Sequence, residues 1–245
     1  MKNLKTYLLA SASVVTLVGT AIAADLPIKT SVPAVPYVAD TWTGAYLGGF
    51  IGVGSHQATC NIGTYGVYGG CNDNDVSPPG NATVKGTSFL GGFDGGYDWQ
   101  LDRNFVMGVA ADWTWTNGLK GTAYGGSGSV SYSSKVNWLA SFRGRMGLAV
   151  DNTMVYATGG VALGSFNDTV MIGTSSQYST SNIPVGWVAG FGVEHKFNQH
   201  WSINAEYRYY DFPTYSVSHT QDAEQYTHQF AHTLNVLQAG FRYRF

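Results

Sequence analysis

Apolar and polar residues alternate without a break over the last nine positions of the chain. One face of this segment is apolar and aromatic and the other is polar or glycine: Leu237, Ala239, Phe241, Tyr243 and Phe245 against Gln238, Gly240, Arg242 and Arg244. Successive side chains of a β-strand point to opposite faces, so the pattern predicts a strand with one apolar and one cationic face. Such a strand is typical of a protein that meets lipid on one side and a polar lumen on the other.

The same alternation recurs in eight segments after residue 41. Each is at least as long as the roughly nine to eleven residues that a tilted strand needs to cross a membrane. In each segment we expect the apolar residues to face outward. The predicted strands are 42–54, 87–99, 105–116, 135–150, 154–164, 185–197, 201–212 and 233–245.

The connections between these segments alternate in length. Long polar segments (55–86, 117–134, 165–184 and 213–232) are separated by short ones (100–104, 151–153 and 198–200). Long and short connections alternate in this way when a meander has one rim outside the cell and the other in the periplasm. The sequence therefore predicts an all-β fold, an eight-stranded antiparallel transmembrane up-and-down β-barrel of the outer-membrane type. We expect its loops to be extracellular and both termini to be periplasmic.

Aromatic residues are also sorted by strand end. Trp99, Trp201 and Phe245 lie near the short connections, whereas Trp113, Trp115, Trp138 and Trp187 lie nearer the long ones. Aromatic rings favour the two membrane interfaces, so this predicts two girdles.

The N-terminus has the features of an export signal. Lys2 and Lys5 precede an apolar stretch, 7–19, and 21–23 is a small-x-small cleavage site. We predict a signal peptide over 1–23, a proline-containing periplasmic leader over 24–41 and the barrel over 42–245.

Composition supports an exported barrel. Charged residues make up 11% of the chain, against roughly a quarter in soluble domains. Removal of Lys2 and Lys5 leaves 11 basic against 15 acidic residues, and this acidic balance argues against nucleic-acid binding.

Charged residues recur on the inward faces of the predicted strands. An eight-stranded barrel is just filled by its own side chains, and buried charges are costly unless they are paired. We therefore predict an ion-paired plug, with a narrow ion path gated by rearranged pairs as the alternative. The predicted lumen network is Asp94, Asp98, Asp112, Arg143, Arg145, Glu194, Lys196, Glu206, Arg208, Arg242 and Arg244.

Two cysteines, Cys60 and Cys71, lie in one segment rich in Gly, Asn and Asp. In an exported chain this favours a local disulfide over a metal pair.

Histidines and acids in the last long loop raise the question of catalysis or metal binding. His219, Asp222, Glu224 and His228 share this loop, but no serine or cysteine nucleophile is placed near them by a strand. We predict no enzymatic activity and no cofactor. Together with His56 and His232, these histidines leave haem or metal binding at the surface open.

Several stretches resemble the small RopB-type outer-membrane proteins of alphaproteobacteria, which belong with the opacity proteins and the OmpA membrane domain. The resemblance covers all the predicted strands and not the long loops. It rests on ADLP at 24–27, WTGAYLGG at 42–49, RGRMG at 143–147, VYATGGVA at 155–162, GW at 186–187, GFGVE at 190–194 and FRYRF at 241–245.

The resemblance implies an outer-membrane barrel that contributes to envelope integrity and displays surface loops. Its implied partners are outer-membrane lipid and lipopolysaccharide, host surface components, and the barrel-assembly machinery, which would read Phe241, Tyr243 and Phe245. Some similar proteins are described as haemin-binding, so a haemin-binding protein or adhesin is a further alternative. A monomer is favoured because the outward faces look evenly adapted to lipid.

Overall fold

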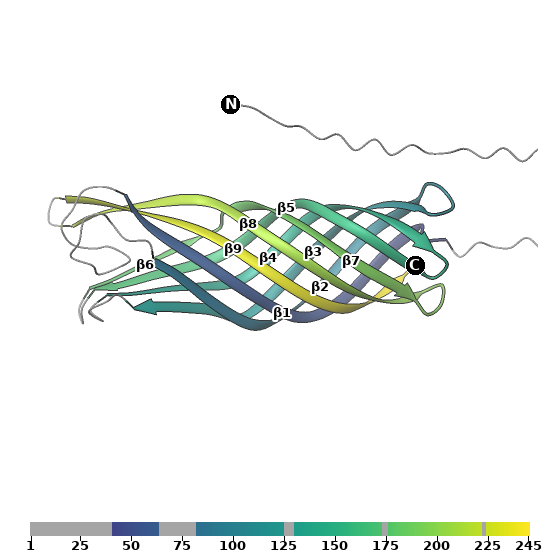
Figure 1. Ribbon diagram of the computed structural model, residues 1–245, viewed down its shortest axis with the longest axis horizontal. Helices are drawn as coiled ribbons and strands as arrows, with labels where there is room; N and C mark the ends of the chain where they lie inside the picture. Colours follow the sequence, from purple (N-terminus) through teal and green to yellow (C-terminus); the bar gives the residue numbers. More distant parts are fainter. Residues whose placement is uncertain (1–40, 64–81, 125–129, 173–175, 222–223) are drawn as a thin grey trace, which may run out of the picture. The chain divides into compact units, whose positions relative to one another are not determined.

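The computed structural model describes residues 41–63, 82–124, 130–172, 176–221 and 224–245 (Figure 1). The predicted signal peptide and all of the predicted leader except Thr41 lie outside these residues. No described residue belongs to a helix long and apolar enough to cross a membrane. The strands are β1 (Gly44–Gly63), β2 (Ala82–Gln100), β3 (Phe105–Tyr124), β4 (Val130–Val150), β5 (Thr153–Ile172), β6 (Ser176–Asn182), β7 (Val185–Lys196), β8 (Trp201–Gln221) and β9 (Glu224–Arg244).

The strands form one closed antiparallel barrel. Neighbours follow the order β4-β3-β2-β1-β9-β8-β7-β5, and a β4–β5 pairing closes the ring. Strands β6 and β7 share one position in the wall, because both pair with β5, over 166–172 and 153–163 respectively. Ile183 and Pro184 separate them, and proline lacks the N–H that a continuous strand would use. The predicted eight-stranded barrel is confirmed.

The connections at 101–104, 151–152 and 197–200 share one end of the barrel with the C-terminus, and we call it the turn end (Figure 1). One of them is the two-residue turn at Asp151 and Asn152, where Asp151 has a φ of 51°. Two-residue hairpin turns of this kind need left-handed backbone, and aspartate tolerates it better than most residues. We call the opposite end the distal end.

The strands are much longer than the sequence analysis predicted. Strand β1 has 20 residues, which corresponds to about 66 Å along the strand and, at a tilt of about 40°, to about 50 Å along the barrel. This is about twice the roughly 25 Å apolar band of an outer-membrane barrel. Most of the residues predicted as long loops therefore extend the strands, and this prediction of loop boundaries was wrong.

The prediction stopped short because the outward side chains change character along the strands. Near the turn end they are apolar: Phe93, Phe142, Phe191 and Phe241 are 49–63% exposed. Toward the distal end the outward positions become polar, as at Gln57, Thr83 and Thr122. The alternation of sides continues, but apolar residues no longer mark the outer face. We call the zone of outward apolar side chains the apolar band.

Of the predicted girdle residues nearer the long connections, Trp113, Trp115 and Trp138 lie in the middle of β3 and β4, and Trp187 lies near the start of β7. Trp113 and Trp138 stack with ring centroids 4.5 Å apart, and Trp187 contacts Tyr209. At the turn end, Trp201 packs edge-on against Tyr243. The apolar band between these two aromatic levels occupies the turn-end half of the barrel.

Three bulges lie just beyond the mid-barrel aromatic level. They interrupt β3–β4 between Trp115 and Leu119, β4–β5 between Val136 and Trp138, and β8–β9 between Phe212 and Tyr215. In the first bulge, Gly118 has a φ of +62°, which glycine adopts without steric cost. Bulges re-aim the strand, and here they shift the inward face from one set of alternate positions to the other, as at buried Thr116 and Leu119 in β3.

The barrel interior is filled in layers. At the turn end, Trp42 is 1% exposed and packs with buried residues that include Val106 and Met154. The sequence pattern predicts that Trp42 begins the first strand, but β1 begins at Gly44 and the ring lies inside the barrel. Above this layer come the charged side chains, and farther toward the distal end an apolar layer, defined as Phe50, Leu90, Leu119, Val136, Leu139, Ala162, Phe166, Val188, Tyr210, Phe212, Leu234 and Val236.

Candidate functional site

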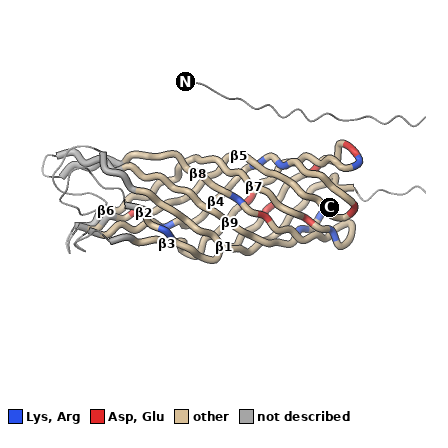
Figure 2. Tube along the Cα trace, in the orientation of Figure 1, with Lys and Arg blue, Asp and Glu red and all other residues tan. Residues whose placement is uncertain are grey.

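The predicted lumen charges come from six strands and all face the interior. Positions an even number of residues apart on one strand share a face. Strands β2, β4, β7, β8 and β9 each contribute a pair of charges, and β3 contributes one. All eleven residues are buried, at 7% exposure or less. Figure 2 shows that most charged positions of the barrel lie in its turn-end half.

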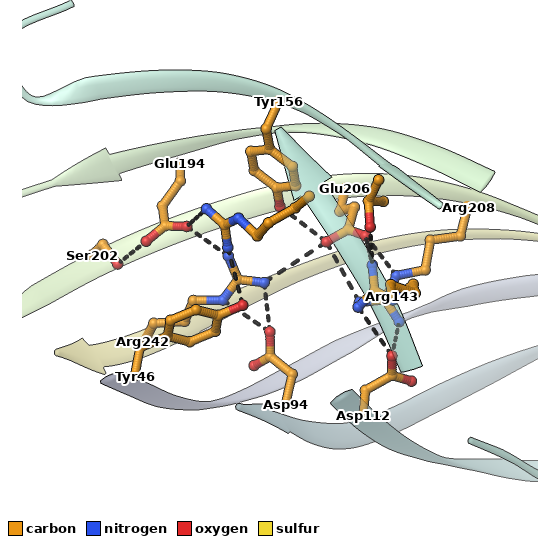
Figure 3. A network of polar contacts seen from close by, with 12 residues as sticks. Tyr46, Asp94, Asp112, Arg143, Tyr156, Glu194, Ser202, Glu206, Arg208 and Arg242 are labelled. Atoms are coloured by element: carbon orange, nitrogen blue, oxygen red, sulfur yellow. Dashed lines mark hydrogen bonds and ion pairs between the residues drawn. The ribbon is translucent and has the colours of Figure 1, made fainter. Parts of the chain in front are cut away.

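Two arginines and two acids form a compact group in the middle of the barrel (Figure 3). Arg143 bridges Asp112 at 3.0 Å and Glu206 at 2.5 Å. Arg208 bridges the same two acids, at 3.1 Å and 2.7 Å. Each guanidinium therefore contacts both carboxylates, and the two positive charges balance the two negative ones.

A second group lies closer to the turn end, and Glu194 is at its centre. Arg242 bridges Glu194 at 2.6 Å and Asp94 at 2.5 Å. Arg145 lies 2.9 Å from Glu194 and 3.3 Å from Asp98.

Arg244 completes this second group. It lies 2.8 Å from Asp98 and 3.4 Å from Glu194. Arg242 also lies 3.7 Å from Glu206 and so links the two groups. Five arginines and five acids thus form one continuous, charge-balanced network, which we call the lumen network.

Lys196 occupies a different place from the other predicted lumen charges. Its Nζ donates a hydrogen bond to the Thr41 carbonyl at 2.8 Å and lies 4.4 Å from the centre of the Trp42 ring. The Arg244 guanidinium also lies over this ring, at 5.5 Å. Trp42 and these two cations therefore cover the lumen network at the turn end.

Neutral side chains satisfy hydrogen-bonding positions that the ion pairs leave open. Tyr156 donates to Glu206 at 2.9 Å, and Ser202 donates to Glu194 at 2.8 Å. Ser141 donates to Asp112, and the Tyr46 hydroxyl accepts from Arg145 at 3.2 Å. Strand alternation could have placed Tyr46 and Ser202 on the inner face, but it does not reveal which charges they contact.

Glycines on the inner face leave room for the network. A Cβ atom at Gly48 would press on Asp94 and Arg242, and one at Gly108 would press on Asp98. The guanidinium groups also stack on aromatic rings, with Arg145 4.3 Å from the centre of the Tyr156 ring. Bulky charged residues and inward glycines therefore fit one another across the lumen.

The apolar layer lies directly against the lumen network. The Arg208 guanidinium is 5.5 Å from the Phe50 ring, and Phe50 belongs to the apolar layer. Within this layer, Phe166 packs edge-on against Phe212 with centroids 4.9 Å apart. Two chemically different layers thus lie one behind the other inside the same lumen.

A small polar cluster lies beyond the apolar layer. His56 and His232 are joined by a 3.1 Å contact between Nε2 and Nδ1. Asp168 lies 3.4 Å from His232 and accepts hydrogen bonds from the Tyr132 and Tyr215 hydroxyls. The sequence pattern placed His56 and His232 at the surface. This was wrong, because both are 0% exposed inside the barrel.

The remaining predicted site residues are only partly described. Cys71 and Asp222 lie outside the described residues, and so do the side chains of Cys60, His219, Glu224 and His228. The disulfide therefore stays a prediction. Within the described part of the chain, no group of three or more His, Cys, Asp or Glu residues could hold a metal ion.

Of the predicted assembly residues, Phe241 and Tyr243 lie on β9, and Phe245 directly follows its last residue. Phe241 and Phe245 are 63% and 74% exposed, and Tyr243 packs edge-on against Phe245 with centroids 5.1 Å apart. The backbone of Phe245 donates to the Ala45 carbonyl at 3.0 Å, next to the β1–β9 seam.

Similar proteins place the chain among bacterial outer-membrane barrels. A 31 kDa outer-membrane immunogenic protein of Brucella melitensis is 29% identical over 232 residues, covering 92% of this chain and 94% of that protein. A 22 kDa outer membrane protein of Rhizobium leguminosarum is 30% identical, covering 71% of this chain and 66% of that protein.

Among solved structures, the outer membrane protease OmpT of Escherichia coli has a TM-score of 0.51 at 7% identity, covering 82% of this chain and 97% of that one. This likeness shows a shared barrel fold. The model of the outer membrane protein beta-barrel domain matches residues 26–245. The chain therefore belongs to the family of outer-membrane proteins with this β-barrel domain, as the resemblance in its strands predicted, and it is an outer-membrane protein.

Proposed function

We propose that this protein is a non-enzymatic structural barrel that supports the integrity of the outer membrane and displays its distal segments at the cell surface. One observation carries the proposal: the lumen network is charge-balanced and buried. Five arginines meet five acids there, and each side chain involved is 5% exposed or less.

The energetics of buried charge favour a fixed plug. Taking a charged group out of water costs several kcal/mol, which ion pairs offset only when their geometry is good and further hydrogen bonds are made. Arg143 and Arg208 each contact both Asp112 and Glu206, so opening a path between them would break several ion pairs at once. The network is better suited to stiffening the barrel than to gating it.

The apolar layer adds a second obstacle to ions. An ion that passed the lumen network would next meet Phe50, Leu139 and Val236, which are 0–5% exposed. An ion passing a dry apolar constriction loses its hydration without replacement. A narrow porin-like channel is the alternative function, and bilayer conductance distinguishes the two.

We infer that the turn end faces the periplasm and the distal end faces the outside. Outer-membrane barrels extend little beyond the membrane on the periplasmic side and farther on the outside, and here the strands continue beyond the apolar band toward the distal end. The polar outward side chains of the distal half fit water outside the membrane. The relatives named outer-membrane immunogenic proteins fit surface display of distal segments.

We also propose that β9 is recognised during assembly. Phe241 on its outer face and the adjoining Phe245 are exposed, and its pairing with β1 closes the barrel. Replacing Phe245 with serine is expected to reduce the amount of folded barrel in the outer membrane. Equal amounts of folded protein would contradict this role.

The proposed function is tested in cells that lack the protein. We expect the deletion strain to be more sensitive to detergents, and expression of the intact chain to restore resistance. A deletion strain with unchanged sensitivity would contradict a role in envelope integrity.

The orientation is tested with an epitope inserted within 125–129, between β3 and β4. We expect an antibody to label it on intact cells, whereas an epitope inserted between Asp151 and Asn152 is labelled only after the outer membrane is opened. The reverse labelling would overturn the orientation.

A further inference from the structure

The lysines and arginines of the barrel are distributed unevenly between its faces. Of the ten described, six point into the lumen and one, Arg103, lies in a short turn. The remaining three, Lys85, Lys120 and Lys135, are exposed on the outer face. These three residues, which we call the lysine patch, lie on the adjacent strands β2, β3 and β4.

The lysine patch is compact. Lys120 and Lys135 are directly opposite each other in the β3–β4 register. The Lys85 carbonyl oxygen lies against Gly121, and the Lys120 carbonyl oxygen lies against Gly86, so β2 continues beside β3 at this level. Neighbouring strands are about 4.8 Å apart, so the three ammonium groups come from backbone positions that span about 10 Å.

This arrangement is unfavourable without an anion. Like charges directly opposite each other on neighbouring strands repel and destabilise the sheet. Within the described part of the chain, no carboxylate forms an ion pair with Lys85, Lys120 or Lys135. Nearby outward positions on these strands carry neutral side chains such as Thr83 and Thr122. The patch is therefore complementary to an external group that carries more than one negative charge.

An apolar surface lies on the turn-end side of the lysine patch. A shallow hollow of about 450 Å³ lies between Phe89 and Trp115, over Gly91. Phe89 is 76% exposed and Trp115 is 55% exposed. On β2, Phe89 lies on the same outer face as Lys85, four residues closer to the turn end. The lysine patch therefore adjoins the apolar surface.

A second apolar hollow lies on the other side of Phe89. It measures about 520 Å³ and is lined by outward residues that include Ile51, Leu237 and the small Ala205 and Ala239. The two hollows flank the exposed Phe89 ring, on the turn-end side of the lysine patch. A ligand that matches this surface has a multiply charged anionic head and more than one apolar chain.

We propose that the lysine patch binds the phosphate groups of lipid A, the phosphorylated and acylated anchor of lipopolysaccharide, with acyl chains lying in the two hollows beside Phe89. The proposal rests on the orientation given under the proposed function, which places the patch at the outer leaflet. Lipid A carries its phosphates at the level of the lysines and its acyl chains at the level of the apolar band. A bound phosphate would also relieve the repulsion between Lys120 and Lys135.

The test is equilibrium binding of diphosphorylated lipid A to the full-length mature protein, refolded in micelles of a neutral detergent. The key variant is the triple replacement Lys85→Gln, Lys120→Gln and Lys135→Gln. Each lysine near an anionic lipid surface contributes about fivefold to binding, so we expect the triple variant to bind about a hundredfold more weakly. A loss of less than threefold would overturn the proposal.

Matched variants separate charge from structure. The triple Lys→Arg variant keeps the three charges and is expected to bind within threefold of the wild type. Arg103→Gln removes an exposed cation at the turn end and is expected to leave binding unchanged. A loss in the arginine variant equal to that in the glutamine variant would contradict electrostatic recognition of phosphate. Unheated gel mobility confirms that each variant is folded.

Comparison ligands identify the source of the phosphate. We expect monophosphorylated lipid A to bind more weakly than the diphosphorylated form, and phosphatidylglycerol or inorganic pyrophosphate to compete poorly. Equal binding of phosphatidylglycerol would overturn the assignment to lipid A and indicate a general anionic-lipid surface. Equal binding of pyrophosphate would show that the acyl chains contribute nothing.

These outcomes are independent of the structural role of the lumen. The three lysines lie on the outer face, so the glutamine variant leaves the lumen network intact. If the wild-type protein conducts ions and the triple variant loses lipid A binding, the plug is refuted and the lipid site is retained. Failure of the epitope experiment would instead remove the outer-leaflet placement on which the lipid A assignment rests.

Discussion

In the turn-end half of the barrel, charged side chains point inward and apolar side chains point outward, whereas in the distal half this order is reversed. Asp94 and Phe93 illustrate the first arrangement, with the acid 2% and the phenylalanine 49% exposed. Ala58 and Gln57 illustrate the second, with the apolar residue buried and the polar one outside.

The difference shows that the surrounding medium determines which interactions hold each half together. The hydrophobic effect requires water, so an apolar interior gains little when the outer face already lies in lipid. There, balanced ion pairs across the lumen connect strands that are not neighbours. In the distal half, water surrounds the wall, and burial of Phe166, Leu234 and Tyr132 is favourable as in a soluble barrel.

Loss of one arginine from the lumen network is expected to have the largest effect. Arg242→Met leaves Asp94 and Glu194 buried without one of their partners, which is expected to cost about 3–5 kcal/mol in the free energy of unfolding. Guanidinium unfolding in micelles, followed by tryptophan fluorescence, measures this change. Arg103→Met, in an exposed turn, serves as the control and is expected to match the wild type. A loss below about 1 kcal/mol for Arg242→Met would show that the network contributes little to stability.

A leucine pair on one strand sharpens the comparison between inside and outside. Leu234 is buried in the apolar layer, and Leu237 faces lipid at 57% exposure. Leu234→Ala creates a cavity and is expected to cost about 3 kcal/mol. Leu237→Ala leaves no cavity, because lipid fills the space, and we expect a much smaller loss. Equal losses in the same unfolding assay would break the distinction between the two sites.

A charge placed on the outer face distinguishes the two halves directly. Phe142→Arg puts a cation into the apolar band and is expected to cost about 2 kcal/mol. The same residue at the exposed distal position, in Thr122→Arg, is expected to leave stability unchanged because water surrounds it. Folding into lipid vesicles, compared between the two variants, measures the difference. Similar losses in both would mean that the apolar band extends to the distal end.

The smallest effect is expected in the distal polar cluster. Tyr132→Phe removes the hydroxyl that donates to Asp168 at 2.8 Å, while Tyr215 still donates to the same carboxylate. We expect a loss of about 1 kcal/mol, the typical contribution of one hydrogen bond. Thermal unfolding of the two proteins side by side tests this. A loss as large as that of Arg242→Met would mean that the cluster is as important as the lumen network.

The sequence was sufficient to predict which residues face inward in the membrane half. At positions such as Phe93, Asp94, Phe241 and Arg242 the two faces differ strongly in polarity, because one meets lipid. The number of strands followed from the same signal. In the distal half, Ser55, Gln57 and Thr59 lie outside while His56 and Ala58 lie inside, and this mixture hides the alternation.

The partners within the site could not be predicted because they depend on register and on distance across the lumen. Inward charges were evident from alternation, but the sequence does not show that Arg145 contacts Asp98 and Glu194, from strands β2 and β7. The His56–His232 contact follows from the β1–β9 register, which is set only when the barrel closes. Trp42 was misplaced because it precedes the first regular strand and folds back into the lumen.

The central claim, that the lumen is sealed by ion pairs and an apolar layer, is tested most directly by conductance. Purified protein refolded into a planar lipid bilayer in molar KCl is expected to give no discrete current steps over prolonged recording. Large, reproducible single-channel steps from folded protein would contradict the sealed lumen and favour a passive channel.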